Sequence, residues 1–256
     1  MSNVRTLIIR APGTNCDGET AFAFQKAGAD VSLSHVNRLI NGDERLLDYQ
    51  IMVIPGGFTY GDDLGAGRVL ANELRVKLGS DILRFIEKGG LILGVCNGFQ
   101  VLVKAGFLPE PFDASRSRVT LTNNDSGKFE CRWVHMRANR NSNCVFTKGM
   151  DRVYLPVAHG EGKFVAEPTS LPVLNVALVY TDEAGNTGAG YPDNPNGSTQ
   201  DIAGICDSSG RVFGLMPHPE RHVLGTQHPR WTRLGAQPQG DGLAVFQNAV
   251  DWAKRL

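Results

Sequence analysis

The sequence contains few cysteines, no long apolar run and no excess of charge of either sign. Its five cysteines, at positions 16, 96, 131, 144 and 206, form no Cys-x-x-Cys pair and are odd in number. This pattern argues against a disulfide framework or a structural zinc site and favours a reducing, cytoplasmic environment. No apolar stretch approaches the ~20 residues that span a bilayer. Lys plus Arg and Asp plus Glu each total 26, which argues against a nucleic-acid binder or a polybasic membrane anchor.

Glycine, by contrast, is abundant, with 30 Gly and 13 Pro in 256 residues. This composition is typical of an enzyme with many tight turns between strands and helices. The first 108 residues alternate strand and helix patterns, and strands that are apolar throughout predict a parallel sheet covered on both faces. We expect strands at 4–9, 29–35, 50–54 and 91–95, and helices at 19–27 (capped by Asp17), 66–77, 81–87 and 97–105.

After Pro111 the pattern changes to alternating apolar and polar residues, as in half-exposed antiparallel strands. We find no linker that divides the chain, so residues 1–256 are expected to form a single α/β domain. Its sheet should be doubly wound and mostly parallel, flanked by helices, with antiparallel additions. The further strands are expected at 118–122, 130–136, 152–157, 173–180, 202–205 and 212–215, with a long loop and hairpin at 181–199 and a closing helix at 241–254.

The most specific local feature is Cys96, which follows a buried strand and precedes a helix. Gly94 and Gly98 flank it at two residues on either side, which is the nucleophile-elbow pattern. The small residues permit a sharp turn, and the N-terminus of the following helix favours a thiolate. The backbone N–H of Asn97 would then serve as an oxyanion donor. A buried structural cysteine in a Gly-flanked turn is the alternative interpretation, and the other four cysteines are interpreted as structural or incidental.

A thiolate nucleophile requires a base, and His218 is the best candidate among the six histidines. It follows the apolar run 212–215 and lies between two prolines. Glu220 is two residues further on, close enough in an extended segment to orient the imidazole. The alternative is a surface histidine with an unrelated glutamate. A zinc site formed by His218 with His222 and His228 is disfavoured, because prolines interrupt the segment and the spacings are irregular.

The third feature is the Gly56-Gly57 turn, which follows the apolar strand at 50–54. Such a turn can direct a backbone N–H toward a reacting carbonyl and supply a second oxyanion donor. The alternative interpretation is that the two glycines only form an ordinary loop. The turn matches no phosphate-binding glycine loop, so the chain shows no nucleotide site of its own.

Together the three features resemble the class I, triad-type glutamine amidotransferases, in which a Gly-Gly turn precedes G-x-C-x-G-x-Q and a late H-x-E. The resemblance extends over nearly the whole chain to the glutaminase subunit or domain of phosphoribosylformylglycinamidine synthase. It is carried by GGFTYGDDLGAGR (56–68), GVCNGFQVL (94–102), NDSGKFECRW (124–133), AHGEGKF (158–164), YPDNPNGS (191–198), IAGICD (202–207) and GLMPHPER (214–221). The fold that it implies is flavodoxin-like.

The resemblance also implies a role for each matching residue. Cys96 would attack the carboxamide of glutamine to form a thioester, His218 would exchange the protons, and Glu220 would orient His218. The N–H groups of Gly57 and Asn97 would form the oxyanion hole. The glutamine pocket would include Gln100, His159, Gly160 and Glu161.

The resemblance implies that the acceptor chemistry takes place on another subunit. The ammonia would pass to a large ATP-dependent synthetase subunit that converts formylglycinamide ribonucleotide to its amidine in purine biosynthesis, with a small bridging subunit as a further partner. This chain would need no metal or cofactor of its own, since ATP and Mg²⁺ are used by the synthetase. We expect glutamine as its substrate, a cytoplasmic location, and neither nucleic acid nor membrane as a partner. Segments 15–17 and 123–126 are candidates for facing the partner or lining a tunnel, although capping and turn chemistry explain them equally well.

Three alternatives remain open at this stage. The first is a stand-alone cysteine hydrolase or peptidase of the same architecture, and the second is an amidotransferase subunit of a different biosynthetic enzyme. The third is a non-catalytic scaffold subunit. Glu220 two residues after His218, together with Gln100, argues against the first. The segments in the second half of the chain argue against the second.

Overall fold

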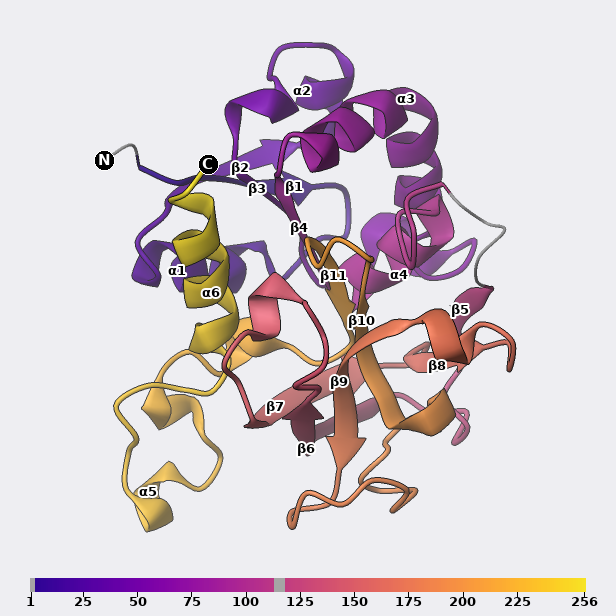
Figure 1. Cartoon of the computed structure of the whole chain (residues 1–256), viewed down its shortest axis with the longest axis vertical. Helices are drawn as coiled ribbons and strands as arrows, with labels where there is room; N and C mark the ends of the chain where they lie inside the picture. Colours follow the sequence, from indigo (N-terminus) through magenta and orange to yellow (C-terminus); the bar gives the residue numbers. More distant parts are fainter. Residues whose placement is uncertain (1–2, 113–117) are drawn as a thin grey trace.

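A nine-stranded mixed sheet forms the centre of the computed structural model, which describes residues 3–112 and 118–256 (Figure 1). Its strand order is β2-β1-β3-β4-β11-β10-β9-β6-β7, and β5 and β8 form a separate two-stranded sheet. The strands are β1 (Arg5–Arg10), β2 (Asp30–His35), β3 (Ile51–Ile54), β4 (Leu91–Val95), β5 (Val119–Thr122), β6 (Glu130–Ala138), β7 (Arg152–His159), β8 (Lys163–Ala166), β9 (Asn175–Thr181), β10 (Ile202–Cys206) and β11 (Val212–Leu215). The helices are α1 (Asp17–Lys26), α2 (Val36–Ile40), α3 (Arg68–Glu87), α4 (Asn97–Ala105), α5 (Trp231–Leu234) and α6 (Leu243–Ala253).

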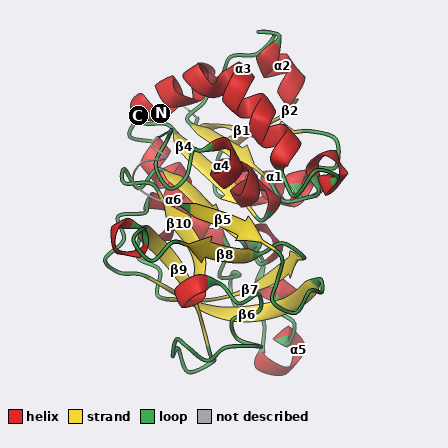
Figure 2. Cartoon of the chain, turned by 90° about the vertical axis from the view of Figure 1, so that its right-hand side faces the viewer, coloured by secondary structure: helices red, strands yellow, loops and turns green. Residues whose placement is uncertain are grey.

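The first half of the sheet is parallel, as the apolar strands predict. Strands β2, β1, β3, β4 and β11 all pair in parallel, and every residue of β3, β4 and β11 is buried. Helices α3 and α4 cover one face of this half, and α1 and α6 cover the other (Figures 1 and 2). This two-sided cover explains why the strands carry apolar residues on both faces.

The second half is antiparallel, which confirms the expectation from the alternating segments. β10 pairs antiparallel with β11 and with β9, and β6 pairs antiparallel with both β9 and β7. β7 alternates buried and partly exposed residues along its length. The sequence reading missed β8, a four-residue strand that pairs with β5. It lies directly after the Gly160–Gly162 turn, and its few residues carry too weak a pattern to be recognised.

Four local expectations were wrong. The expected helices at 66–77 and 81–87 are one helix, α3, because Leu74, Leu78 and Ile82 continue a single buried stripe through Gly79. Asp17 does not cap α1 but is its first residue and pairs with Arg10, while Cys16 takes the N-cap position. The 182–199 loop contains no strand and so no hairpin. The segment after His218 is not extended, because Pro219–Arg221 form a 3₁₀ turn.

No helix within the described part of the chain is long and apolar enough to cross a membrane.

Candidate active site

The turn between β4 and α4 places Cys96 in a strained backbone conformation. Cys96 has φ 50° and ψ −105°, a combination that non-glycine residues rarely adopt. The flanking glycines are required by space, because a Cβ on Gly98 would lie 1.8 Å from the carbonyl oxygen of Ile54. A Cβ on Gly94 would lie 2.7 Å from the carbonyl oxygen of Gly98. The turn therefore has the nucleophile-elbow geometry, with the buried thiol at the N-terminus of α4.

His218 lies beside this turn because β11 and β4 are parallel neighbours. Leu215 pairs with Val95, so the segments that follow the two strands leave the sheet at the same edge. The backbone N–H of His218 donates to the carbonyl of Pro156 at 2.9 Å, which ties the segment to β7. Nδ1 of His218 contacts Oε1 of Glu220 at 2.6 Å, and both side chains are buried. The expected contact between the histidine and the glutamate is therefore present.

Electrostatics favour a charged imidazole at His218. Burial opposes protonation, but the interactions with Glu220 and then Cys96 outweigh it and raise the pKa of His218 well above its ordinary value. Nε2 of His218 has no hydrogen-bond partner among the described residues. The Cys96 thiol donates to the carbonyl of Ala158 at 3.6 Å. Its sulfur is also close enough to His218 to contribute to the raised pKa of the imidazole. The arrangement brings together a cysteine, a histidine and a glutamate, the residue types expected of a nucleophile, a base and an orienting carboxylate.

The Gly56-Gly57 turn lies at the same edge of the sheet. Gly57 has φ 152°, and a Cβ there would approach the carbonyl oxygen of Gly13 to 2.7 Å. The carbonyl of Gly56 accepts hydrogen bonds from the N–H groups of Asn15 and Cys16, so the loop before α1 fixes this turn. Asn97 is the first residue of α4, and an N–H at this position has no acceptor inside the helix.

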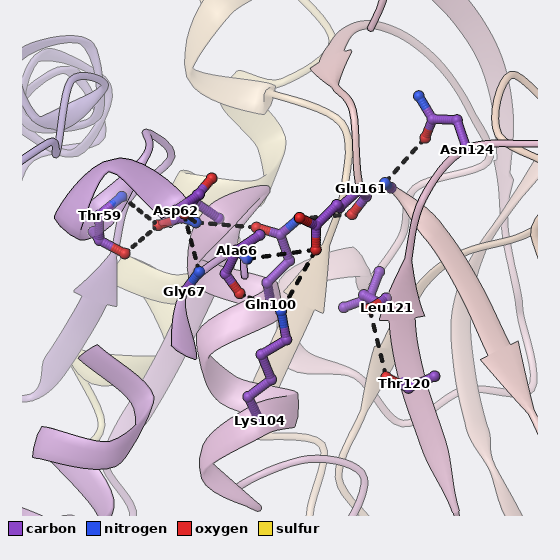
Figure 3. A network of polar contacts seen from close by, with 12 residues as sticks. Thr59, Asp62, Ala66, Gly67, Gln100, Lys104, Thr120, Leu121, Asn124 and Glu161 are labelled. Carbon is purple, nitrogen blue, oxygen red and sulfur yellow. Dashed lines mark hydrogen bonds and ion pairs between the residues drawn. The ribbon is translucent and has the colours of Figure 1, made fainter. Parts of the chain in front are cut away.

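A polar network joins the elbow to the neighbouring loops (Figure 3). Oδ1 of Asn97 accepts a hydrogen bond from the Thr59 hydroxyl at 2.7 Å, and Nδ2 of Asn97 donates to Asp62 at 3.2 Å and to Gln100 at 3.0 Å. Nε2 of Gln100 donates to the carbonyl of Glu161 at 2.6 Å. Gln100 and Glu161, both expected in the glutamine pocket, are therefore in direct contact.

The carboxylate of Glu161 points along α4 toward a lysine. It lies 3.7 Å from Nζ of Lys104 and accepts a hydrogen bond from the N–H of Ala66 at 3.4 Å. Burial lowers the pKa of Lys104 and raises the pKa of Asp62. The sequence reading missed Asp62 and Lys104. Lys104 lies four residues after Gln100, and this spacing on a helix was the available signal.

His159 lies at the end of β7, where the chain enters the same turn. Its Nδ1 contacts Oδ1 of Asn124 at 3.1 Å, and the Asn124 amide also donates to the His159 carbonyl at 2.8 Å. Burial, and then the positive charge of His218, lower the pKa of His159 to about 4. Asn124 is buried and holds this turn, whereas residues 123, 125 and 126 are exposed, so the expectation that segment 123–126 faces a partner or lines a tunnel stays a prediction.

The loop at 15–17 adjoins the same site. Cys16 is buried, and its sulfur lies 3.9 Å from Nδ1 of His218. Its sulfur points into the site while Asn15 is exposed, so the expectation that segment 15–17 faces a partner or lines a tunnel stays a prediction. Sγ of Cys16, Nδ1 of His218 and a carboxylate oxygen of Glu220 lie within 4.8 Å of one another, the one such group of metal-ligand residue types found in the described ranges. His222 and His228 instead pack with Trp133 at ring distances of 5.1 and 6.0 Å.

Comparisons with known proteins agree with this geometry. The sequence model of the CobB/CobQ-like glutamine amidotransferase domain matches residues 3–253. The chain is 57% identical to the phosphoribosylformylglycinamidine synthase subunit PurQ of Dehalococcoides mccartyi, over the full length of both. It is 35% identical to the subunit of that name from Thermotoga maritima, covering 98% of this chain and 99% of the other.

Solved structures give the same result. A chain in the structure of PurLQS from Thermotoga maritima superposes with a TM-score of 0.76 at 34% identity, covering 98% of this chain and 99% of that one. A glutamine amidotransferase from the same organism has a TM-score of 0.57 at 16% identity, and this likeness bears on the fold alone.

Proposed function

Because the chain belongs to the CobB/CobQ-like glutamine amidotransferase family and, within it, to the PurQ subunits of phosphoribosylformylglycinamidine synthase, we propose that it is the glutaminase of that enzyme. It releases ammonia from glutamine for the amidation of formylglycinamide ribonucleotide in purine biosynthesis. The single observation that carries the proposal is the strained Cys96 turn beside the buried His218–Glu220 pair.

Each step of the proposed reaction uses one group of the site. The Cys96 thiolate attacks the carboxamide carbon of glutamine, and the N–H groups of Gly57 and Asn97 stabilise the oxyanion. The carbon–nitrogen bond then breaks, and the His218 imidazolium gives its proton to the departing nitrogen, which leaves as ammonia. Water next attacks the γ-glutamyl thioester with His218 as base, and glutamate and the thiolate are released. Glu220 holds the imidazole throughout.

The glutamine is held at the 159–161 turn and by Gln100. The supporting observation is the 2.6 Å bond from Gln100 to the Glu161 carbonyl, which brings the two segments together next to the nucleophile turn. His159, as a neutral, buried ring, contacts the Asn124 side chain that holds this turn.

The acceptor chemistry belongs to partner subunits. We assign ATP and Mg²⁺ to a large synthetase subunit and include a small bridging subunit in the complex, as the relative named PurLQS suggests. The chain itself then requires no cofactor. A cytoplasmic location agrees with its five unpaired cysteines, which suit a reducing compartment.

The test is glutamate release from glutamine, measured for the chain alone and with synthetase, ATP and formylglycinamide ribonucleotide. Strong stimulation in the complete mixture is expected. Equal, rapid release in both mixtures would instead indicate an autonomous hydrolase, and no release in either would exclude a glutaminase.

The matched variants are Cys96→Ala and Cys206→Ala, both at buried cysteines. Cys96→Ala should abolish glutamine-dependent turnover of the complex and leave turnover with added ammonium intact. Cys206→Ala should retain both activities. Full activity of Cys96→Ala with glutamine would show that the chain is a scaffold.

A further inference from the structure

Cys16 is a buried thiol beside the His218–Glu220 pair that the proposed reaction does not use. It lies immediately before α1, and its sulfur is 3.9 Å from Nδ1 of His218. Nη2 of Arg221 donates to the same sulfur at 3.1 Å, and the thiol donates to Oδ1 of Asn15 at 3.1 Å. The sulfur therefore contacts both the imidazole and the cation next to it.

Arg221 is placed to compete with His218 for the glutamate. Its Nε lies 4.0 Å from Oε1 of Glu220, the same oxygen that His218 contacts at 2.6 Å. Oε2 of Glu220 is buried and has no hydrogen-bond partner in the described part of the chain. A guanidinium favours two parallel hydrogen bonds to a carboxylate. Arg221 does not make that pair here, and its Nη2 is directed to Cys16 instead.

Cys16 also helps to confine the imidazole ring. A Cβ on Gly56 would lie 2.8 Å from Cε1 of His218 and 3.1 Å from Sγ of Cys16. The ring therefore lies against Gly56 and the Cys16 sulfur, and it cannot turn far without displacing one of them. This confinement fixes the direction of Nε2, the ring nitrogen left to serve Cys96.

We propose that Cys16 is a positioning residue of the active site: it engages Arg221, so that Glu220 is left to His218, and it holds the imidazole ring in place. The inference rests on the proposed glutaminase function and concerns the same site. A metal site at Cys16, His218 and Glu220 is disfavoured, because the guanidinium of Arg221 contacts the sulfur and would repel a cation.

The charged and titratable groups around His218 predict the direction of the effect. Burial lowers the pKa of His218, whereas the Glu220, Cys96 and Cys16 contacts raise it. Replacement of Cys16 removes one of these contacts and lets Arg221 approach Glu220, and both changes lower the pKa of His218. The groups that face or adjoin the ring are Glu220 and Arg221 from its own segment, Cys16 before α1, Cys96 before α4 and His159 at the end of β7.

The direct test is an NMR titration of the ¹⁵N-labelled histidine rings in the purified chain. The His218 signal is identified by its loss in His218→Gln. In Cys16→Val, which fills the space but accepts no hydrogen bond, the His218 midpoint should fall by about one pH unit. Cys16→Ser, which still accepts from Arg221, should keep the midpoint near that of the wild type, and the matched control Cys206→Ala should not change it.

A second variant separates competition by Arg221 from simple loss of packing. In the double variant Cys16→Val with Arg221→Gln, the His218 midpoint should recover in part, because the competing guanidinium is gone while the Cys16 contact stays lost. A midpoint that is unchanged in both Cys16→Val and Cys16→Ala, with near-native melting temperatures, would overturn the proposal.

Activity provides the last readout. In Cys16→Val the glutaminase kcat/KM should fall roughly tenfold or more, because the base is displaced. The alkaline limb of its pH profile should move to lower pH, because the imidazolium is lost earlier. If the wild type releases no glutamate but the His218 midpoint still shifts, the proposed function fails while the coupling of Cys16 to His218 stands.

Discussion

Two buried histidines at the same site have pKa values shifted in opposite directions. The pKa of His218 is raised, because the contacts with Glu220 and the cysteines outweigh the effect of burial. His159 is lowered to about 4, because burial is its main influence and the nearby charge of His218 adds to it. A single site therefore holds one charged and one neutral imidazole at neutral pH, which keeps two positive rings from adjoining each other.

The depressed pKa of His159 predicts acid instability of the fold. The unfolded chain takes up a proton at His159 below pH 6.5, whereas the folded chain resists until about pH 4. The free energy of unfolding should therefore fall as the pH drops through this window, by up to about 3 kcal/mol. His218 does not contribute to this slope, since its raised pKa affects stability on the alkaline side.

Urea unfolding at a series of pH values measures the effect. His159→Gln should have a smaller slope between pH 6.5 and 4 than the wild type, whereas His135→Gln, at a half-buried ring on β6, should retain it. Identical slopes for His159→Gln and the wild type would contradict the assignment.

At the scale of elements, helices α1 and α4 differ in the space that they leave for a side chain at their second residue, which is glycine in both. Gly18 and Gly98 are each the second residue of their helix. A Cβ on Gly18 would meet no atom of the described residues within 4 Å, whereas a Cβ on Gly98 would lie 1.8 Å from the backbone oxygen of Ile54. The close approach of α4 to β3 is therefore possible only with glycine.

This comparison predicts that a glycine-to-alanine substitution changes the stability of the chain in opposite directions in the two helices. Gly98→Ala should destabilise the chain by at least ~3 kcal/mol, because α4 must move away from the sheet. Gly18→Ala should stabilise it by up to ~1 kcal/mol, because alanine is the better helix former. Chemical denaturation of both variants gives the two values. Equal stabilities of the two variants would mean that α4 can move away from the sheet without loss of stability.

Sequence patterns predicted the elements of this fold better than the contacts between them. The parallel strands and the Cys96 turn were predictable because their signals are local: apolar runs, flanking glycines and short spacings. His218 and Glu220 were predictable as a pair because they are two residues apart. The approach of Cys16 to His218 was not, because 202 residues separate them and the contact depends on how the loop before α1 pairs with Gly56.

At the scale of the whole molecule, one sheet runs through both the parallel and the antiparallel halves. β11 and β10 join the halves by antiparallel pairing, and the buried apolar residues form one cluster from Val4 to Ala253. α6 links them further, since Phe246 packs on Phe24 of α1 at 4.9 Å and Asn248 donates to the Phe146 carbonyl at 3.0 Å. The boundary between the halves is therefore packed as core.

This continuity predicts that the chain unfolds as one cooperative unit, in agreement with the expected single domain. Trp133 on β6 reports on the antiparallel half and Trp252 on α6 reports on the helix that joins the two. In two single-tryptophan variants, made by replacing the other tryptophans with Phe, the fluorescence transitions in guanidinium chloride should coincide with each other and with far-UV circular dichroism. Unfolding of the Trp133 region at a lower denaturant concentration would instead show that the antiparallel half is a separate unit, and the chain would then have two domains.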